Sequence, residues 1–405
     1  MHFCLIFRTL EMGGMQTLML RMSDWLEARG HSVTVLSAED GPVRSMFSAR
    51  TRVIADGARL DAVARGSTAA ARRFLRSELD GQHVDVFFAF AADALWLASA
   101  ILNAQDRPAR CIAGAFGPNE FGIGRVARQR PWLSGLLYPE TQLFLHHLPS
   151  DCRLYMNRGV EELVTKSLGE HAPGILWPLP VDGTRYLKLD RRPEPGLIVS
   201  VGRLATMKEY NLWMIDVIAG LRRAGRDVRW HVYGDGPLRG QMESRIRQRG
   251  MEGCITLAGE LPYADLPSVL SRAYAFVGMG TAIIEAGFAA VPAVVAPIFR
   301  TTPETYGLLS ELPDYACGEY IDMPFRPAID IVDSLLRLSD VEYERVSKAQ
   351  REHAMRFESE RLMVRFLEIV GSSPEFERLW HPSHRYGVAI GIRNAVRGLR
   401  RALRG

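Results

Sequence analysis

Residues 197–211 read LIVSVGRLATMKEYN, and this stretch decides the fold. Its first five residues are an apolar run, which predicts a strand buried on both faces, as in a parallel sheet. Gly202 lets the chain turn where that strand ends, and apolar residues at helical spacing follow from Leu212. Strand, glycine turn and helix in this order begin a βαβ unit, so this part of the chain is predicted to be α/β with a parallel sheet.

The same pattern extends in both directions. Further strands are predicted after it at 229–233, 254–258, 275–277 and 293–296, with helices between them and a charged helical segment at 329–370. Strands are predicted before it at 3–7, 31–37, 84–90 and 111–115, and a helix at 15–29 follows Gly13 and Gly14. The chain therefore holds two α/β domains, each beginning with a strand and a glycine turn.

A proline-rich segment at 176–196 separates the two domains and is interpreted as a linker. We expect an N-terminal domain at 1–182, a C-terminal domain at 183–373 and a separate tail at 374–405. Ligands of such sheets bind at the carboxyl ends of the strands, so the site is expected in the cleft between the two domains.

Composition narrows the class of protein. Hydrophobic residues make up 47% and charged residues 24% of the 405 residues, as in an ordinary globular protein. The five cysteines form no C-x-x-C pair, which argues against a disulfide framework or a zinc site and favours small apolar core residues in a reducing compartment. Neither a signal peptide nor an apolar stretch of about 18 residues is found, so a cytoplasmic protein is expected.

Charge is placed unevenly along the chain. The net charge is +4, and removing the seven arginines that follow Glu377, which no acid accompanies, leaves −3 for the rest. Because the basic character belongs to the tail alone, nucleic acid is not expected as a partner.

Two cations lie on the predicted loop after strand 197–201. Arg203 and Lys208 precede a helix, so a diphosphate there would meet a guanidinium fork, an ammonium and a positive helix terminus. If a nucleoside diphosphate is the leaving group, such cations also stabilise the charge that grows in the transition state. The alternative is a basic pair exposed on the surface of a βα loop.

A second glycine turn follows strand 275–277. Gly278 and Gly280 precede a helix that begins near Thr281, and backbone N–H groups there, including that of Ala282, are expected to cradle phosphate oxygens. Glu285 lies one turn into the helix, where a carboxylate could accept hydrogen bonds from both ribose hydroxyls of a nucleotide. The alternative is a glutamate that only interacts favourably with the helix dipole.

Other motifs are weaker or missing. Gly234-Asp-Gly236 is a short turn at the same edge, and a lone G-x-G is weak evidence. Neither G-x-G-x-x-G after the first strand nor G-x-x-x-x-G-K-[ST] is present, so a nicotinamide dehydrogenase and a P-loop ATPase are not supported.

Taken in order, these features resemble the retaining glycosyltransferases of family 4, as found in bacterial polysaccharide biosynthesis. The resemblance covers about 12–37 and 176–300, through segments such as PLPVDGTRY, VGRLATMKEYN, VYGDGPL and GTAIIEAGFAAVP. It implies the GT-B fold, in which two Rossmann-like domains face each other across a cleft, here with a C-terminal helical tail. It also implies a donor of the nucleoside diphosphate sugar type, such as a UDP- or GDP-sugar, and neither metal nor cofactor.

The resemblance assigns roles to individual residues. Gly14, with Gly13 beside it, would approach the donor diphosphate or the acceptor, while the loop from Gly202, with Arg203 and Lys208, would hold the diphosphate. The remaining donor contacts would come from the second domain, with Glu285 on the ribose and the backbone elsewhere: Gly234, Gly259, Leu261, Gly280, Thr281 and Ala282. Of these backbone contacts, Gly259 and Leu261 would flank the base.

Two positions depart from the family pattern. Members usually carry a second glutamate eight residues before the ribose glutamate, which contacts the donor sugar, and here that position is Val277. Members often place a histidine after a central strand of the first domain, and here Asn119 and Glu120 are the polar groups. Glu120 is therefore a candidate to orient or deprotonate an acceptor hydroxyl, or else a solvated loop carboxylate.

Two segments are candidates for contact with an anionic membrane surface, on the inner face of the plasma membrane. Residues 386–405 are predicted to form a basic amphipathic helix, which would either lie in such a surface or pack back on the first domain. Residues 125–138 combine three arginines with Trp132 and Tyr138, which suits a lipid-linked acceptor or a core helix with a charged start.

The sequence leads to a glycosyltransferase that moves a sugar to a glycan or lipid-linked acceptor. The alternative, motivated by Val277 and the missing histidine, is a catalytically silent GT-B protein that acts as a binding partner in a glycan-assembly complex. A phosphorylase on the same fold would need a pyridoxal lysine, and no motif for that cofactor is found.

Overall fold

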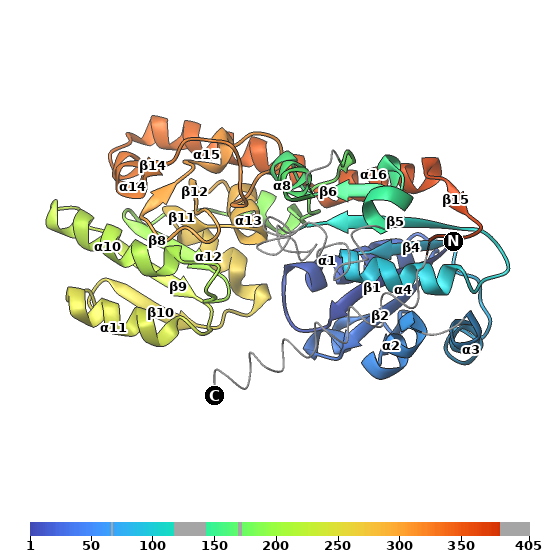
Figure 1. Ribbon diagram of the computed structural model, residues 1–405. Coiled ribbons are helices and arrows are strands. Elements are labelled where there is room, and N and C mark those ends of the chain that lie inside the picture. The colour runs from blue at the N-terminus through green and yellow to red at the C-terminus, as the bar shows by residue number, and fades with distance from the viewer. Residues whose placement is uncertain (66–67, 117–142, 169–171, 381–405) are drawn as a thin grey trace. The chain divides into compact units, whose positions relative to one another are not determined.

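The computed structural model describes residues 1–65, 68–116, 143–168 and 172–380. The chain divides into two compact α/β units (Figure 1). One unit is Met1–Pro178 together with the chain from Met363, and the other is Leu179–Leu362.

The first unit is built on a parallel sheet in the order β3-β2-β1-β4-β5-β6-β7. Its strands are β1 (His2–Thr9), β2 (Ser32–Glu39), β3 (Arg52–Ala55), β4 (Val86–Ala89), β5 (Ala109–Ala115), β6 (Arg153–Tyr155) and β7 (Ile175–Leu176). Its helices are α1 (Gly14–Glu27), α2 (Gly57–Arg65), α3 (Thr68–Glu78), α4 (Ala92–Leu102), α8 (Arg158–Leu168) and most of α16 (Ser359–Ser372). The central strand β1 is buried on both faces from His2 to Ile6, as its apolar run predicts, and α4 lies across β1, β4 and β5 (Figure 1).

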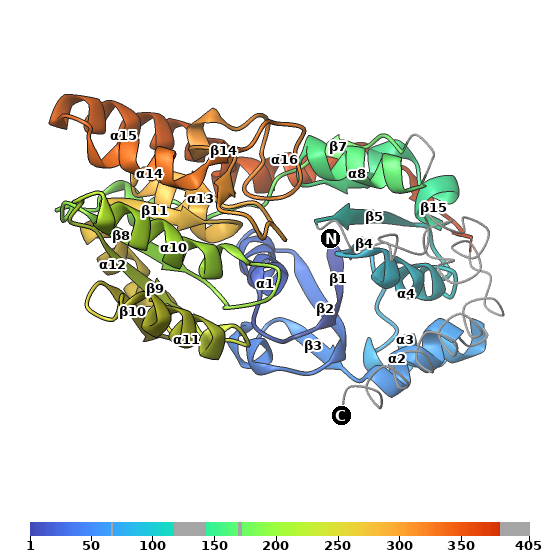
Figure 2. The same cartoon turned by 60° about the vertical axis from the view of Figure 1, so that its left-hand side comes forward.

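The second unit has a five-stranded parallel sheet in the order β10-β9-β8-β11-β12. Its strands are β8 (Leu197–Val201), β9 (Arg229–Tyr233), β10 (Ile255–Gly259), β11 (Ala275–Gly278) and β12 (Ala293–Val295). Its helices are α9 (Thr184–Leu187), α10 (Tyr210–Arg223), α11 (Arg239–Arg249), α12 (Leu266–Arg272), α13 (Thr281–Phe288), α14 (Ala328–Leu336) and α15 (Asp340–Ala354), and α10 and α11 lie side by side (Figures 1 and 2). A short antiparallel pair, β13 (Glu304–Thr305) with β14 (Arg326–Pro327), follows β12.

Both sheets have the Rossmann order, with the first strand in the middle and successive strands added to either side. The expected strands at 197–201 and 229–233 are confirmed to the residue, and the other expected strands are confirmed within a few residues. The helical prediction for 329–370 is also confirmed, by α14, α15 and α16. The short strands β3, β6 and β7 were not expected.

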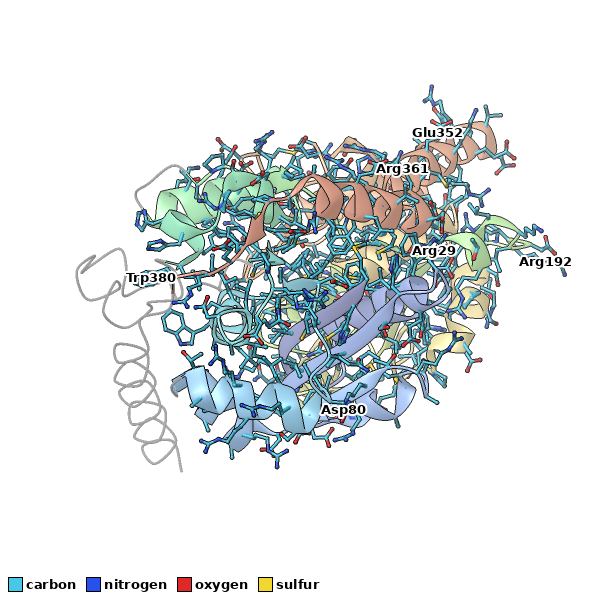
Figure 3. All side chains as sticks on the ribbon, turned by 90° about the vertical axis from the view of Figure 1, so that its right-hand side faces the viewer. Arg29, Asp80, Arg192, Glu352, Arg361 and Trp380 are labelled. Atoms are coloured by element: carbon cyan, nitrogen blue, oxygen red, sulfur yellow. The ribbon has the colours of Figure 1, made fainter. Side chains whose placement is uncertain are left out.

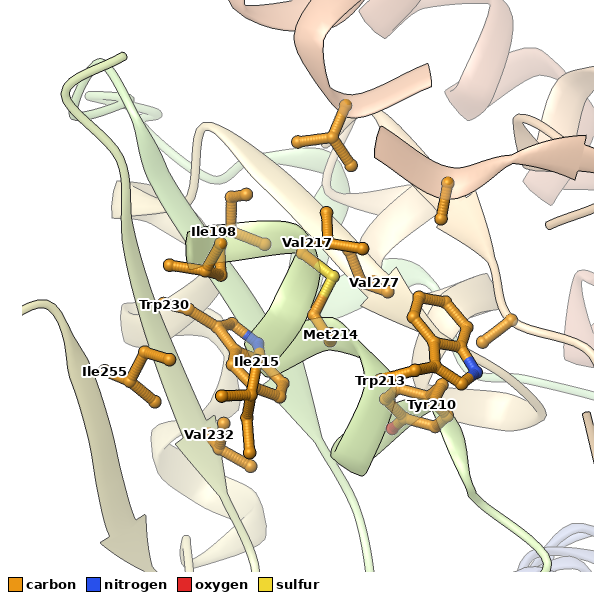
Figure 4. Close-up of a cluster of buried hydrophobic side chains, with 14 of the residues drawn as sticks. Ile198, Tyr210, Trp213, Met214, Ile215, Val217, Trp230, Val232, Ile255 and Val277 are labelled. Atoms are coloured by element: carbon orange, nitrogen blue, oxygen red, sulfur yellow. The ribbon is translucent and has the colours of Figure 1, made fainter. Parts of the chain in front are cut away.

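The core of the second unit packs α10 onto the sheet. Figure 4 shows Ile198 and Trp230 from the sheet close to Met214 and Val217 from the helix, all buried. The Trp230 indole N–H donates to Ser200 Oγ (2.9 Å), and that hydroxyl donates to the Val277 carbonyl oxygen (2.7 Å). These bonds satisfy the side chains of Trp230 and Ser200, whose polar atoms would otherwise be buried without a partner.

The compact units differ from the expected boundaries. The first unit ends at Pro178 rather than 182, and residues from Met363 join it rather than the second unit. The reason is Phe366 on α16, which is fully buried and packs its ring 5.2 Å from Phe88 and 5.3 Å from Trp177.

The expected separate tail also begins inside the first unit. β15 (Glu375–Phe376) pairs antiparallel with β5, and Leu379 N–H donates to Asn103 Oδ1 (2.7 Å). The segments proposed for membrane contact, 125–138 and 386–405, lie outside the described residues. In the described part of the chain, every helix is too short or too polar to cross a membrane.

All five cysteines are free, and four of them are buried: Cys4, Cys111, Cys152 and Cys317. Burial raises the pKa of these thiols, which fits the expected role as small core residues.

Replacing Phe366 with alanine tests the assignment of α16 to the first unit. We expect Phe366→Ala to lower the free energy of unfolding of that unit by about 3–5 kcal/mol, because a buried ring leaves a cavity. Val364 on the same helix is 43% exposed, so Val364→Ala should change it by less than about 1 kcal/mol. Urea unfolding followed by fluorescence measures both variants, and equal effects would show that α16 does not anchor the unit.

Candidate functional site

Four strands of the second sheet end at a glycine on the same edge. Gly202 follows β8, Gly234 follows β9, and β10 and β11 end at Gly259 and Gly278. Because the strands are parallel, their carboxyl ends share one edge, and glycines leave its backbone bare of side chains. A ligand can therefore approach the main chain closely there.

Gly202 and Gly234 bring two of these loops into contact. Their φ angles are +142° and +132°, which other residues rarely adopt, and a Cβ on Gly234 would lie 2.2 Å from the Gly202 carbonyl oxygen. The Gly202 N–H donates to the Tyr233 carbonyl, and the Leu204 N–H to the Asp235 carbonyl, both at 2.9 Å. The turn after β9 therefore holds the loop 202–208 through main-chain hydrogen bonds. The Gly234 N–H donates to the Gly259 carbonyl oxygen (2.6 Å), which ties this turn to the end of β10.

Lys208 folds back over that loop. A Cβ on Gly202 would lie 2.5 Å from Lys208 Nζ, so the ammonium occupies the space that a side chain at 202 would fill. Burial lowers the pKa of the Lys208 ammonium below its ordinary value of 10.5. Arg203 lies exposed on the same loop. Within the described residues, neither Arg203 nor Lys208 forms an ion pair with a carboxylate.

The neighbouring strand β11 leads into α13, so its loop begins about 5 Å from the loop of β8. Gly280 has a φ of +70° and donates its N–H to the Cys317 carbonyl oxygen (2.7 Å). That N–H is therefore engaged within the protein. Thr281 and Ala282 are the first residues of α13, where N–H groups have no partner within the helix.

Glu285 lies on α13 and is only 5% exposed. Its Oε1 accepts a hydrogen bond from the Tyr263 hydroxyl (2.6 Å). Burial, and then the charge of Glu285, raise the pKa of the nearby Tyr186. Sequence reasoning missed Tyr263, although it follows Gly259 and Leu261 by only a few residues; its partner is 22 positions away.

Val277 is a strand residue in the core and is fully buried (Figure 4). Only Met279 and Gly280 connect β11 to α13, so the position eight residues before Glu285 falls inside the strand rather than on a loop. The Val277 side chain packs in the apolar core of the second unit, where a carboxylate without a partner would be costly.

The glycine pair of the first unit follows β1. Gly13 precedes α1 with an extended backbone, and a Cβ on it would lie 2.7 Å from Gln16 Oε1. Gly14 is the first residue of α1, and a Cβ there would meet no atom within 4 Å. Gly14 therefore leaves open space at the carboxyl end of β1. Glu120 lies outside the described residues.

The structure thus brings together, at one edge of the second sheet, the loop with Arg203 and Lys208, the glycines 202, 234 and 259, and the start of α13. Leu261 is half-buried just beyond Gly259. Over the described ranges, His, Cys, Asp and Glu side chains form no group of three or more that could hold a metal ion.

Comparison with known proteins identifies the family that this part of the chain matches. Residues 188–308 match the family described as glycosyl transferases group 1. They contain β8 to β12, and therefore all four glycines at the carboxyl ends of the strands: Gly202, Gly234, Gly259 and Gly278.

Two curated relatives come from Streptomyces kanamyceticus. An alpha-D-kanosaminyltransferase is 36% identical over 83 residues, which is 20% of either chain. A 2-deoxystreptamine glucosyltransferase is 33% identical over 119 residues, 29% of this chain and 30% of the relative. The chain thus matches less than a third of the length of these relatives.

Similarity in fold to solved structures covers nearly the whole chain. The crystal structure of Anabaena HepE in complex with UDP and glucose covers 92% of this chain and all of its own, with a TM-score of 0.64 and 13% identity. The chain therefore has the GT-B fold of two Rossmann-like units, and its residues 188–308 match the group 1 glycosyl transferases in sequence.

Proposed function

We propose that this protein is a glycosyltransferase that takes a sugar from a nucleoside diphosphate donor and transfers it to an acceptor hydroxyl. One observation carries the proposal. The Lys208 ammonium is partly desolvated, lies against the Gly202 backbone and forms no ion pair with a carboxylate in the described part of the chain. A desolvated cation without a counter-charge is costly to the folded protein, and an anionic ligand removes that cost.

A diphosphate is the anion that suits this edge. The exposed Arg203 guanidinium offers a fork of donors, Lys208 offers a point charge, and Thr281 and Ala282 offer N–H groups at the positive end of α13. As the sugar bond breaks, negative charge grows on the diphosphate, so these groups bind the transition state more tightly than the donor.

The rest of the donor is assigned along the same edge. Glu285 would accept ribose hydroxyls, and the backbone at Gly259 and Leu261 would flank the base. A UDP- or GDP-sugar fits this arrangement, and the fold shared with HepE, which was crystallised with UDP and glucose, supports a uridine donor.

The acceptor side of the proposal is drawn from the sequence. We propose a glycan or lipid-linked acceptor, with Glu120 orienting its hydroxyl and with retention of the anomeric configuration. The basic and aromatic residues of 125–138, and the basic tail, support a lipid-linked acceptor. The names of the two curated relatives favour a transferase over a catalytically silent partner.

Thermal shift with UDP and GDP tests the donor site. One of the two should raise the melting temperature, and Arg203→Ala should weaken its binding about 10–100-fold, since a hydrogen bond to a charged group contributes about 1.5–3 kcal/mol. Transfer is then followed by mass spectrometry with a panel of the matching nucleotide-sugars, and NMR of the product gives its anomeric configuration.

Arg192 provides the matched control, because its side chain is 84% exposed and stands clear of the second unit (Figure 3). Arg192→Ala should bind the nucleotide like the unsubstituted protein. The donor site proposed here does not exist if no nucleoside diphosphate stabilises the protein, or if both arginine variants behave alike.

The lowered pKa of Lys208 predicts a pH dependence. Above its lowered pKa the free protein holds a neutral amine, whereas a bound diphosphate favours the ammonium, so binding takes up a proton. Affinity for the nucleotide should therefore begin to fall with rising pH below 10.5, where an ordinary lysine is still charged.

Calorimetry in two buffers of different ionisation enthalpy measures the proton uptake. Lys208→Arg should keep the charge and abolish the uptake, because a guanidinium stays protonated. Lys188→Arg, at an exposed position, should leave it unchanged. Equal proton uptake in all three proteins would contradict the role given to Lys208.

A further inference from the structure

The hydroxyl of Tyr263 is held on the carboxylate that the proposed function assigns to the ribose. Its distance to Glu285 Oε1 is 2.6 Å, within the range of a strong bond between a hydroxyl and a charged acceptor. Tyr263 is 54% exposed as a residue, whereas Glu285 is 5% exposed. An exposed side chain thus reaches inward and donates to a buried carboxylate.

Neighbouring groups fix Tyr263 in this position. The guanidinium of Arg185 lies 4.5 Å from the centre of the Tyr263 ring, and its Nη1 donates to the Tyr263 carbonyl oxygen (3.3 Å). Arg185 belongs to α9, which approaches α13 closely: a Cβ on Gly183 would lie 2.3 Å from the Phe288 ring. This segment therefore contacts Tyr263 through Arg185, and it packs against α13, the helix of Glu285, at Gly183.

A ribose hydroxyl and a phenol present the same group to a carboxylate, an O–H that donates one hydrogen bond. A buried carboxylate that loses a donor is destabilised, so a bond of this kind is exchanged rather than simply broken.

We propose that Tyr263 is a specificity-determining residue of the nucleotide site: on Glu285 Oε1 its hydroxyl occupies the place of a ribose hydroxyl, and nucleotide binding exchanges one O–H donor for the other. This inference rests on the proposed function, because it takes Glu285 as the ribose acceptor. The Glu285 carboxylate then accepts a hydrogen bond both with and without nucleotide. Because ribose binding must break the bond to Tyr263, the protein binds ribonucleotides more weakly than it would without that hydroxyl.

The substitution Tyr263→Phe removes the competing hydroxyl and keeps the ring. We expect it to bind UDP, or GDP if that is the nucleotide bound, about five- to tenfold more tightly by calorimetry, while its melting temperature without ligand falls by a few degrees, since a hydrogen bond to a charged acceptor is lost. With 2′,3′-dideoxy-UDP or the guanosine analogue, which has no ribose hydroxyl to place on Glu285, the gain should vanish.

Tyr274 provides the matched control, since its hydroxyl donates to the Leu335 carbonyl (2.9 Å) rather than to Glu285. Tyr274→Phe should leave nucleotide affinity unchanged. Should Tyr263→Phe fold poorly, Arg185→Ala loosens the hold on Tyr263 without altering either partner, and we expect a smaller gain in the same direction.

The outcomes separate this inference from the function on which it rests. Binding of UDP or GDP by the unsubstituted protein, with equal or weaker affinity in Tyr263→Phe, overturns the exchange and leaves the donor site standing. A gain that persists with the dideoxy nucleotide also overturns it, because the ribose hydroxyls would then play no part. Absence of nucleotide binding in every variant means instead that the proposed function has failed.

Discussion

The carbonyl oxygen of Gly202 lies where a side-chain carbon at position 234 would have to be, and the candidate site depends on this approach. It allows the turn after β9 to support the loop after β8 through main-chain hydrogen bonds. The space above Gly202 is in turn filled by the Lys208 ammonium. Packing against backbone requires glycine at 234, and the positive φ angles favour it at both positions. The Lys208 ammonium is held there without an acidic partner among the described residues.

Cationic and anionic side chains lie at different places along the carboxyl end of the second sheet. Arg203 and Lys208 follow β8 and suit an anion, whereas Glu285 follows β11 and suits a hydroxyl donor. The N-terminus of α13 lies before Glu285 in the chain, so the positive end of the helix and the carboxylate share one element. A ligand that carries both a diphosphate and hydroxyls matches this order along the edge.

Much of the second unit could be predicted from the sequence, because four of the five strands of its parallel sheet end at or just before a glycine. Leu197–Val201 and Arg229–Tyr233 are examples in which the turn residue marks the end of the strand. β3 and β6 were missed because they have only four and three residues, too few to show a periodic pattern. Glu120 lies outside the described residues, so its role stays a prediction.

Contacts between distant residues could not be predicted in this way. The pattern of α16 indicates an apolar face, but it does not say which sheet that face covers. The contact between Tyr263 and Glu285 likewise joins two motifs that were each interpreted alone. The strand prediction for 275–277 placed Val277 correctly, but it did not show that this side chain packs in the core of the second unit.

The return of the chain to the first sheet at Met363 has a consequence for how the molecule is made. The second unit is one continuous stretch inserted into the first, and the first unit gains most of α16, and then β15 for its sheet, only after that stretch is complete. During synthesis Phe88 and Trp177 therefore lack the ring of Phe366 until the chain beyond Met363 leaves the ribosome. A fragment that stops before Met363 would keep a complete second unit and expose apolar surface on the first.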